Sequence, residues 1–289
     1  MSAAPALNDE AGLDRILARV SEVPVLPHVV YKVMEISGSA ESSSQELERA
    51  IVIDPGFSSK LLSLANSAYY GLPRRVTSVS EAITFLGFKS IRQLAMTVGV
   101  FDLFIGKNDK DSLRRRRWWR HSVDSAVCCR WLAKKNRELQ PESAYTVGLL
   151  HIIGKTLLDR FGEEPYEKVE MLMEHGVDDL RAELAVYKCD HIQVGVAAAS
   201  QWGFPDELVV ALEYDRPAPD GDPWATHRAC VMLGSRIADL ALVGQDLSEA
   251  ELIVLPTWAL EQMGFSQDQM PDLVSAATQV IGEAASIQL

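Results

Sequence analysis

The apolar residues of this 289-residue sequence recur with helical spacing from its first segment to its last. The first apolar stripe occupies positions i, i+3, i+4 and i+7: Leu13, Ile16, Leu17 and Val20. A helix presents residues with this spacing on one face, where they can be buried. No segment shows the sustained apolar–polar alternation between hairpin turns that is typical of β-strands. The sequence therefore predicts an all-α fold.

Capping residues predict where several of these helices begin and end. Ser43 and Glu46 have the spacing of a capping box, in which each side chain binds a backbone N–H of the first turn. Asp54 followed by Pro55 is typical of an N-cap and a first helical turn. Gly87 is expected to end one helix before a longer helix follows.

A polar segment at residues 106–111 interrupts the helical pattern with glycine, asparagine and charge, which indicates a boundary between two lobes. We therefore predict an N-terminal helix or arm at 1–20 and a first helical lobe at 21–105. A second helical lobe follows at 106–245, and residues 246–289 form a C-terminal helical appendage.

Charge and composition limit which classes of partner and which cellular compartment we expect for the chain. The net charge is −12, which disfavours sequence-independent binding to nucleic acid or to an anionic membrane, because both would repel it. No apolar run approaches the ~18 residues that a membrane span requires, and the N-terminus lacks the regions of a signal peptide. The four cysteines lack CxxC spacing and are expected to be reduced thiols. We therefore expect a cytoplasmic protein without nucleic-acid or membrane partners.

Three histidines and one aspartate lie on separate predicted helices of the second lobe: His121, His151, His191 and Asp239. Helical bundles build metal sites from histidines and carboxylates on neighbouring inward-facing helices. The same residues are also compatible with hydrogen-bonded polar groups inside a helical core, which is the interpretation we favour. Spacing alone leaves both interpretations open.

Several long motifs of the first lobe carry a family resemblance. They are Ile53-Asp54-Pro55, the run LLSLANSAYYGLP at 61–73 and the run AITFLG at 82–87, and Trp-Gly-Phe-Pro follows at 202–205. Together they resemble the HDOD (HD-related output domain) family, a branch of the HD superfamily of metal-dependent phosphohydrolases. The resemblance implies that the second lobe is an HD-like helical bundle. It also implies a role as an output or scaffold element in bacterial signalling.

The resemblance further implies where a metal site would lie. HD hydrolases hold one or two divalent metals with a histidine, an adjacent His-Asp pair and a later aspartate, and the metals activate water. The positions that match are His121, His151, His191 and Asp239. However, Ile152 stands where the aspartate of the pair is expected, and Tyr214-Asp215 stands where the family commonly has two histidines. We therefore interpret the four residues as a relic pocket and predict no catalytic residue, metal or cofactor.

Other residues are candidates for a ligand or partner surface: Arg114, Arg115, Arg117, Trp118, Tyr69, Tyr70 and Lys155. The basic segment could clamp a nucleotide, or its arginines could be solvated or form salt bridges around a helix. Lys155 matches a position where related phosphodiesterases place a phosphate-facing lysine, although a solvated lysine at a helix end explains it too. The two tyrosines either offer apolar surface to a partner or fasten their turn to its helix.

Three functions remain as hypotheses. The leading one is a non-catalytic bacterial regulatory module that binds a signalling protein, namely a kinase, a receiver or a cyclic-nucleotide turnover protein. The second is a nucleotide sensor, for example of a cyclic dinucleotide, that uses the arginine segment or the relic pocket. The third is a residual metal-dependent phosphohydrolase in which three of the four relic residues hold one metal.

Overall fold

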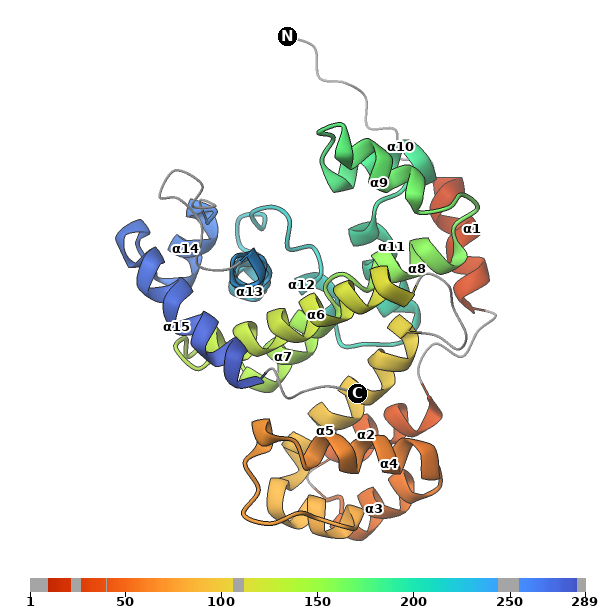
Figure 1. Ribbon diagram of the computed structural model, residues 1–289, viewed down its shortest axis with the longest axis vertical. Coiled ribbons are helices and arrows are strands. Elements are labelled where there is room, and N and C mark those ends of the chain that lie inside the picture. Colours follow the sequence, from red (N-terminus) through yellow and green to blue (C-terminus); the bar gives the residue numbers. More distant parts are fainter. Residues whose placement is uncertain (1–9, 22–26, 40, 106–111, 244–254, 285–289) are drawn as a thin grey trace.

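The computed structural model describes residues 10–21, 27–39, 41–105, 112–243 and 255–284. Throughout these ranges the regular structure is helical, and no described residue lies in a strand (Figure 1). The prediction of an all-α fold is confirmed. The two helical lobes and the C-terminal helical segment are also present.

The first lobe is built around one long helix. Its elements are α2 (His28–Gly38), α3 (Ser44–Val52), α4 (Pro55–Ala65), the 3-10 turn η1 (Ala68–Tyr70) and α5 (Val79–Ile105). Helices α2, α3 and α4 all contact α5. The predicted caps are confirmed, since Ser43 and Glu46 form a capping box and Asp54 accepts from the backbone of Phe57 at 3.0 Å.

Gly87 interrupts α5 as the sequence predicts. Its φ of 74° and ψ of 169° lie outside the helical region, in a conformation that glycine adopts at little cost because it has no Cβ. The helix therefore consists of a short first part and a long second part that differ in direction.

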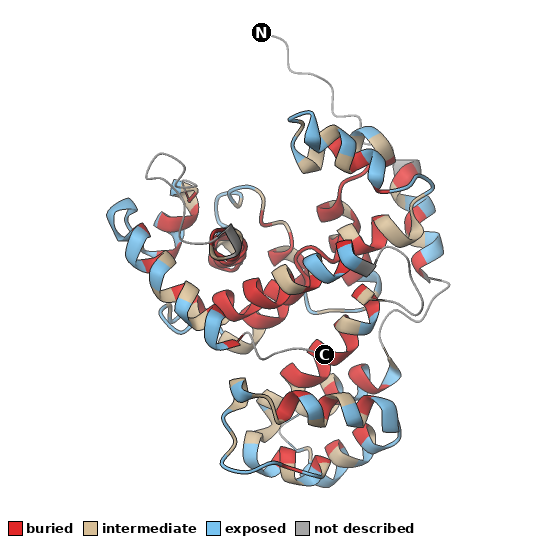
Figure 2. Ribbon diagram, in the orientation of Figure 1, coloured by how far each residue is buried: buried red, intermediate tan, exposed pale blue. Residues whose placement is uncertain are grey.

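Within its described residues, 112–243, the second lobe has eight helices: α6 (Ser112–Ala133), α7 (Pro141–Leu150), α8 (Ile153–Phe161), α9 (Glu167–Glu174), α10 (Asp179–Tyr187), α11 (His191–Gln201), α12 (Asp206–Ala211) and α13 (Ala225–Val243). Its centre is the contact of α6 with α7 and α13, and buried residues follow these helices in Figure 2. Helices α8 and α11 also lie close together. A Cβ built on Gly154 would approach the carbonyl oxygen of His191 to 1.8 Å, so this contact requires glycine.

The terminal helices pack on the second lobe. Helix α1 (Glu10–Ser21) contacts α8 and α11, and α14 (Thr257–Met263) contacts α13. After the 3-10 turn η3 (Gln267–Gln269), α15 (Met270–Glu283) contacts both α13 and α6. The C-terminal segment therefore covers one side of the bundle.

The predicted lobe boundary at 106–111 lies outside the described residues. The helix before it belongs to both lobes, because α5 contacts α2, α3 and α4 of the first lobe as well as α6, α7 and α8 of the second. All four cysteines are buried free thiols. None of the helices in the described part of the chain is both long and apolar enough to cross a membrane.

Candidate functional site

A cleft of about 500 Å³ opens in the second lobe. Helices α6, α8, α10, α11 and α13 contribute residues to its walls. Three of the relic residues line it, namely His121, His191 and Asp239. The fourth, His151, follows α7 and is 1% exposed.

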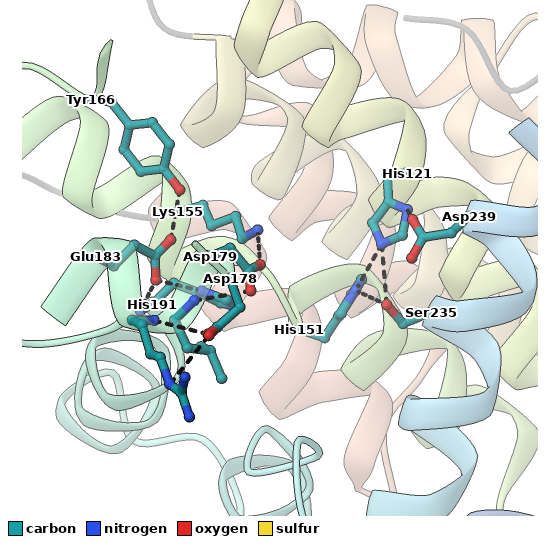
Figure 3. A network of polar contacts seen from close by, with 12 residues as sticks. His121, His151, Lys155, Tyr166, Asp178, Asp179, Glu183, His191, Ser235 and Asp239 are labelled. Carbon is teal, nitrogen blue, oxygen red and sulfur yellow. Dashed lines mark hydrogen bonds and ion pairs between the residues drawn. The ribbon is translucent and has the colours of Figure 1, made fainter. Parts of the chain in front are cut away.

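Two histidines and a serine form a compact triangle beside this cleft (Figure 3). The Nε2 atoms of His121 and His151 are 3.1 Å apart. The Ser235 hydroxyl lies 3.2 Å from the first of these atoms and 3.1 Å from the second. The side chains come from α6, from the residue after α7, and from α13. Three polar atoms of distant parts of the sequence therefore meet at one point.

The backbone and one carboxylate orient the two imidazoles. His151 donates through Nδ1 to the carbonyl oxygen of Gly148 at 2.7 Å, and the Nδ1 atom of His121 lies 3.1 Å from an Asp239 carboxylate oxygen. Burial, followed by the neighbouring His121, holds the pKa of His151 well below its usual value. His151 is therefore neutral at pH 7, and its Nε2 lone pair faces Nε2 of His121 and the hydroxyl of Ser235.

Ser235, rather than Asp239, occupies the place opposite the paired nitrogens. Asp239 lies one helical turn later on α13 and contacts the outer nitrogen of His121 instead. The sequence interpretation matched the later HD aspartate to Asp239, and the structure places Asp239 in the cleft in contact with His121. Sequence reasoning missed Ser235, because a serine has no spacing signal of its own.

His191 belongs to a separate network. Its backbone N–H and its Nδ1 both contact one oxygen of Glu183, at 2.8 and 2.7 Å. The other oxygen of this fully buried carboxylate accepts from the hydroxyl of Tyr166 at 2.6 Å. The Nε2 atom of His191 lies 3.4 Å from the hydroxyl of Tyr214. Sequence reasoning missed Glu183, because nothing in its local pattern distinguishes it from a solvated helix residue.

Replacing Glu183 by glutamine tests this network through its pH dependence. Burial raises the pKa of Glu183, but the charge and the hydrogen bond of His191 lower it overall to below the ordinary value of 4.5. A depressed carboxyl pKa stabilises the fold above about pH 4.5, and this stabilisation is lost as the pH falls through the folded-state pKa. We expect Glu183→Gln to lower the free energy of unfolding by about 1–3 kcal/mol at pH 7.

Urea denaturation of both proteins at pH 7 and at about pH 4 measures the effect. The difference in the free energy of unfolding between wild type and Glu183→Gln should be smaller at the lower pH. Glu174→Gln, at an exposed site, serves as the control and should change the free energy of unfolding little at either pH. An equal loss of stability at both pH values would contradict a role for the Glu183 charge.

The donor set at the triangle does not fit an HD-type metal. It offers two imidazole nitrogens and one neutral hydroxyl, whereas hard divalent cations prefer carboxylates. Ile152 lines the cleft with a hydrocarbon side chain that is 4% exposed. Within the described residues, no three His, Cys, Asp or Glu side chains are grouped so that they could hold a metal ion. Tyr214 adds bulk instead of a ligand, since its ring lies 5.2 Å from that of His151.

Lys155 forms an ion pair with a carboxylate of its own chain. Its ammonium group contacts Asp179 at 2.6 Å. Burial raises the pKa of Asp179, but Lys155 and His191 outweigh that effect and lower it to about 2. Lys155 therefore serves first to neutralise Asp179.

The basic segment divides into buried and exposed residues. Arg114 is 8% exposed and pairs with Asp159, Glu167 and Glu170 at 2.7 to 2.8 Å. Arg115 is 1% exposed and contacts Asp159 at 3.1 Å. The structure therefore corrects the placement of these two arginines on a ligand or partner surface, because they form an internal ion network.

The remaining surface candidates are accessible to different degrees. The Arg117 side chain is 76% exposed, and Arg117 and Trp118 both line the cleft. Trp118 packs edge-on against Tyr166 with a centroid distance of 4.9 Å. Tyr69 and Tyr70 are partly buried in a turn that does not line the cleft.

Comparison with solved structures supports this fold. The chain is 22% identical to an HDOD domain protein of unknown function from Geobacter sulfurreducens, with a TM-score of 0.78 over 97% of this chain and 99% of that one. A Shewanella amazonensis protein provisionally described as a phosphohydrolase is 21% identical, with a TM-score of 0.72 and coverage of 95% and 98%. A Marinobacter aquaeolei protein provisionally described as a signal transduction protein is 21% identical, with a TM-score of 0.70 and coverage of 96% and 64%.

Sequence comparison gives the family. An uncharacterised protein of Treponema pallidum is 24% identical over 210 residues, which are 71% of this chain and only 39% of that protein. The chain thus spans about two fifths of the length of this relative. The HDOD domain model matches residues 23–217, which is more than half of the chain. The protein therefore belongs to the HDOD domain family.

Proposed function

We propose that this chain is a non-catalytic regulatory module of bacterial signal transduction that acts by binding another protein. Family membership and the likeness to a Marinobacter protein provisionally described as a signal transduction protein support the signalling role. The observation that carries the non-catalytic part is the chemistry around the two imidazoles. Ile152 and Ser235 stand beside them, and neither residue brings the carboxylate that hydrolysis by a metal-bound water requires.

The charges of the cleft do not favour the nucleotide-sensor alternative. Its cationic side chains are Arg117, Lys155 and Arg236, and its carboxylates are Asp178, Asp179, Asp215 and Asp239. A phosphate-rich ligand would meet these four carboxylates, and each of the three cations already lies within 4.0 Å of a carboxylate. Buried Arg114 and Arg115 cannot supply the missing charge.

The proposal is tested by metal analysis and a hydrolysis assay. We expect the protein, purified without added metal, to contain no stoichiometric manganese, iron or zinc. We also expect no turnover of bis(p-nitrophenyl) phosphate or nucleoside phosphates with added Mn²⁺, because neither Ile152 nor Ser235 places a carboxylate beside the two imidazoles.

His151→Ala is the matched control for this assay. Any rate that survives this change belongs to a contaminant or to the solvent, whereas a rate that the change abolishes in folded protein belongs to the cleft. Stoichiometric metal together with such a rate would show that the chain is an enzyme.

A further inference from the structure

A groove of about 700 Å³ lies where the first lobe meets α6 and α15. Its walls come from the turn η1, from α5, from α6 and from α15, and it shares no lining residue with the cleft. Ala68, Lys134 and Glu283 line it and are exposed, so the groove opens to solvent. The walls therefore join three parts of the chain that are far apart in sequence.

The groove combines aromatic and aliphatic walls. Tyr69 and Tyr70 pack edge to face with a centroid distance of 5.0 Å. The other apolar lining residues are Leu86, Val127, Trp131 and Val280. Tyrosine and tryptophan are enriched at protein interfaces, because they offer large contact areas together with a polar atom. Such walls suit an apolar side chain of a partner.

No ion pair among the described residues joins Arg130 or Lys134 of the groove to a carboxylate. Arg130 donates through one guanidinium nitrogen to the hydroxyl of Tyr69 at 2.9 Å. Neither Arg130 nor Lys134 has an ion pair with a carboxylate of the described residues, whereas Arg114 has three such pairs. Lys135 adds a positive charge nearby, since its ammonium group lies 4.5 Å from the centroid of Trp131.

Among the lining residues, the net charge of the groove is thus opposite in sign to that of the whole chain. Arg130 and Lys134 face a single carboxylate among the lining residues described, that of Glu283, in a chain with a net charge of −12. Complementary potentials favour an acidic partner and disfavour a basic one.

We propose that this groove binds an acidic segment of a protein partner. An aliphatic or aromatic side chain of the segment enters between Tyr69, Tyr70 and Trp131, and a neighbouring carboxylate meets Arg130 and Lys134. This inference rests on the proposed function, because it assigns the surface through which the module binds. A segment bound there contacts both lobes at once, so it stabilises the lobe arrangement that keeps the groove walls together.

The test uses a random peptide library displayed on phage, selected on the full chain. Clones that the Lys134→Glu variant also captures are removed. We expect the remaining peptides to share aspartate or glutamate next to leucine, phenylalanine or tryptophan. A fluorescent peptide of the consensus sequence should bind the wild-type chain measurably by anisotropy, and its affinity should fall as salt is raised.

Two matched controls separate charge from fold. Lys134→Glu should weaken binding of the consensus peptide at least about tenfold. Arg116→Glu makes the same change of charge at an exposed site near the start of α6, the helix that ends just before Lys134, and it should leave binding within about twofold. Replacing the acidic residues of the peptide by their amides should weaken binding as much as Lys134→Glu does.

Three outcomes would overturn the proposal: no peptide sensitive to Lys134→Glu, a consensus without acidic residues, or equal effects of Lys134→Glu and Arg116→Glu. Concentration-dependent dimerisation that Lys134→Glu abolishes would assign the groove to a second copy of the chain and would also overturn it. None of these results concerns metal content or turnover at the cleft, so the non-catalytic proposal stands or falls separately.

Discussion

Replacing Ile152 and Ser235 together by aspartate is expected to create a site for a divalent metal. The change places one carboxylate on the cleft wall next to His151 and another opposite the paired Nε2 atoms of His121 and His151. Two imidazoles and two carboxylates then converge, which is a common donor set for manganese, iron or zinc. We expect about one ion per chain by elemental analysis. A metal at 100 times its dissociation constant should stabilise the variant by about 2.7 kcal/mol.

A neutral double variant, Ile152→Leu with Ser235→Ala, is the matched control and should gain no metal. The single variants separate the two positions. If Ile152→Asp alone bound metal as tightly as the double variant, Ser235 would not be the α13 position that faces the site. If the folded double variant bound no metal, two added carboxylates would not be sufficient to make a metal site in this cleft.

Arg115→Glu is expected to lower the free energy of unfolding by at least about 4 kcal/mol more than Arg116→Glu, although the two positions are adjacent. Arg115 is 1% exposed and contacts Asp159, whose side chain is 3% exposed. A glutamate there would bury a second negative charge beside the first and would break the ion network that joins α6 to α8 and α9. Arg116 is exposed, so its reversal should change stability by less than about 0.5 kcal/mol.

Denaturant titration of the three proteins measures this difference. Total stabilities of about 5–15 kcal/mol are usual, so Arg115→Glu is expected to lose most of its folded population. Arg115→Met keeps much of the side-chain bulk without the charge and provides a variant that retains more stability. A small effect of Arg115→Met would contradict the importance of the buried pair, whatever the solubility of the glutamate variant.

Local patterns were sufficient to predict the helices of this protein. The capping box at Ser43 and Glu46, the N-cap at Asp54 and the interruption at Gly87 depend on residues within one helical turn, and the structure shows each of them. The all-α class could also be predicted locally, because the apolar periodicity of each helix depends only on the residues of that helix.

The site was predicted only in part, because its geometry depends on how helices are rotated against one another. The sequence identified His121 and His151, but it offered no way to place Ser235 opposite them or to join Glu183 to His191. Four consecutive arginines from 114 to 117 must point in different directions around a helix. Which of them face inward was decided by carboxylates on α8 and α9, at least 42 positions further along the chain.

Sharing α5 between the lobes makes them parts of one folding unit. The helix completes the first lobe through its contacts with α2, α3 and α4, and it also packs on α6, α7 and α8. Neither lobe can therefore keep its whole apolar interior if the chain is cut beside this helix, and a fragment ending there would expose surface that α6 and α7 normally cover. Any tilt of α5 against the three small helices of the first lobe must therefore be accompanied by repacking against α6, α7 and α8, so a change of packing in one lobe alters the packing of the other.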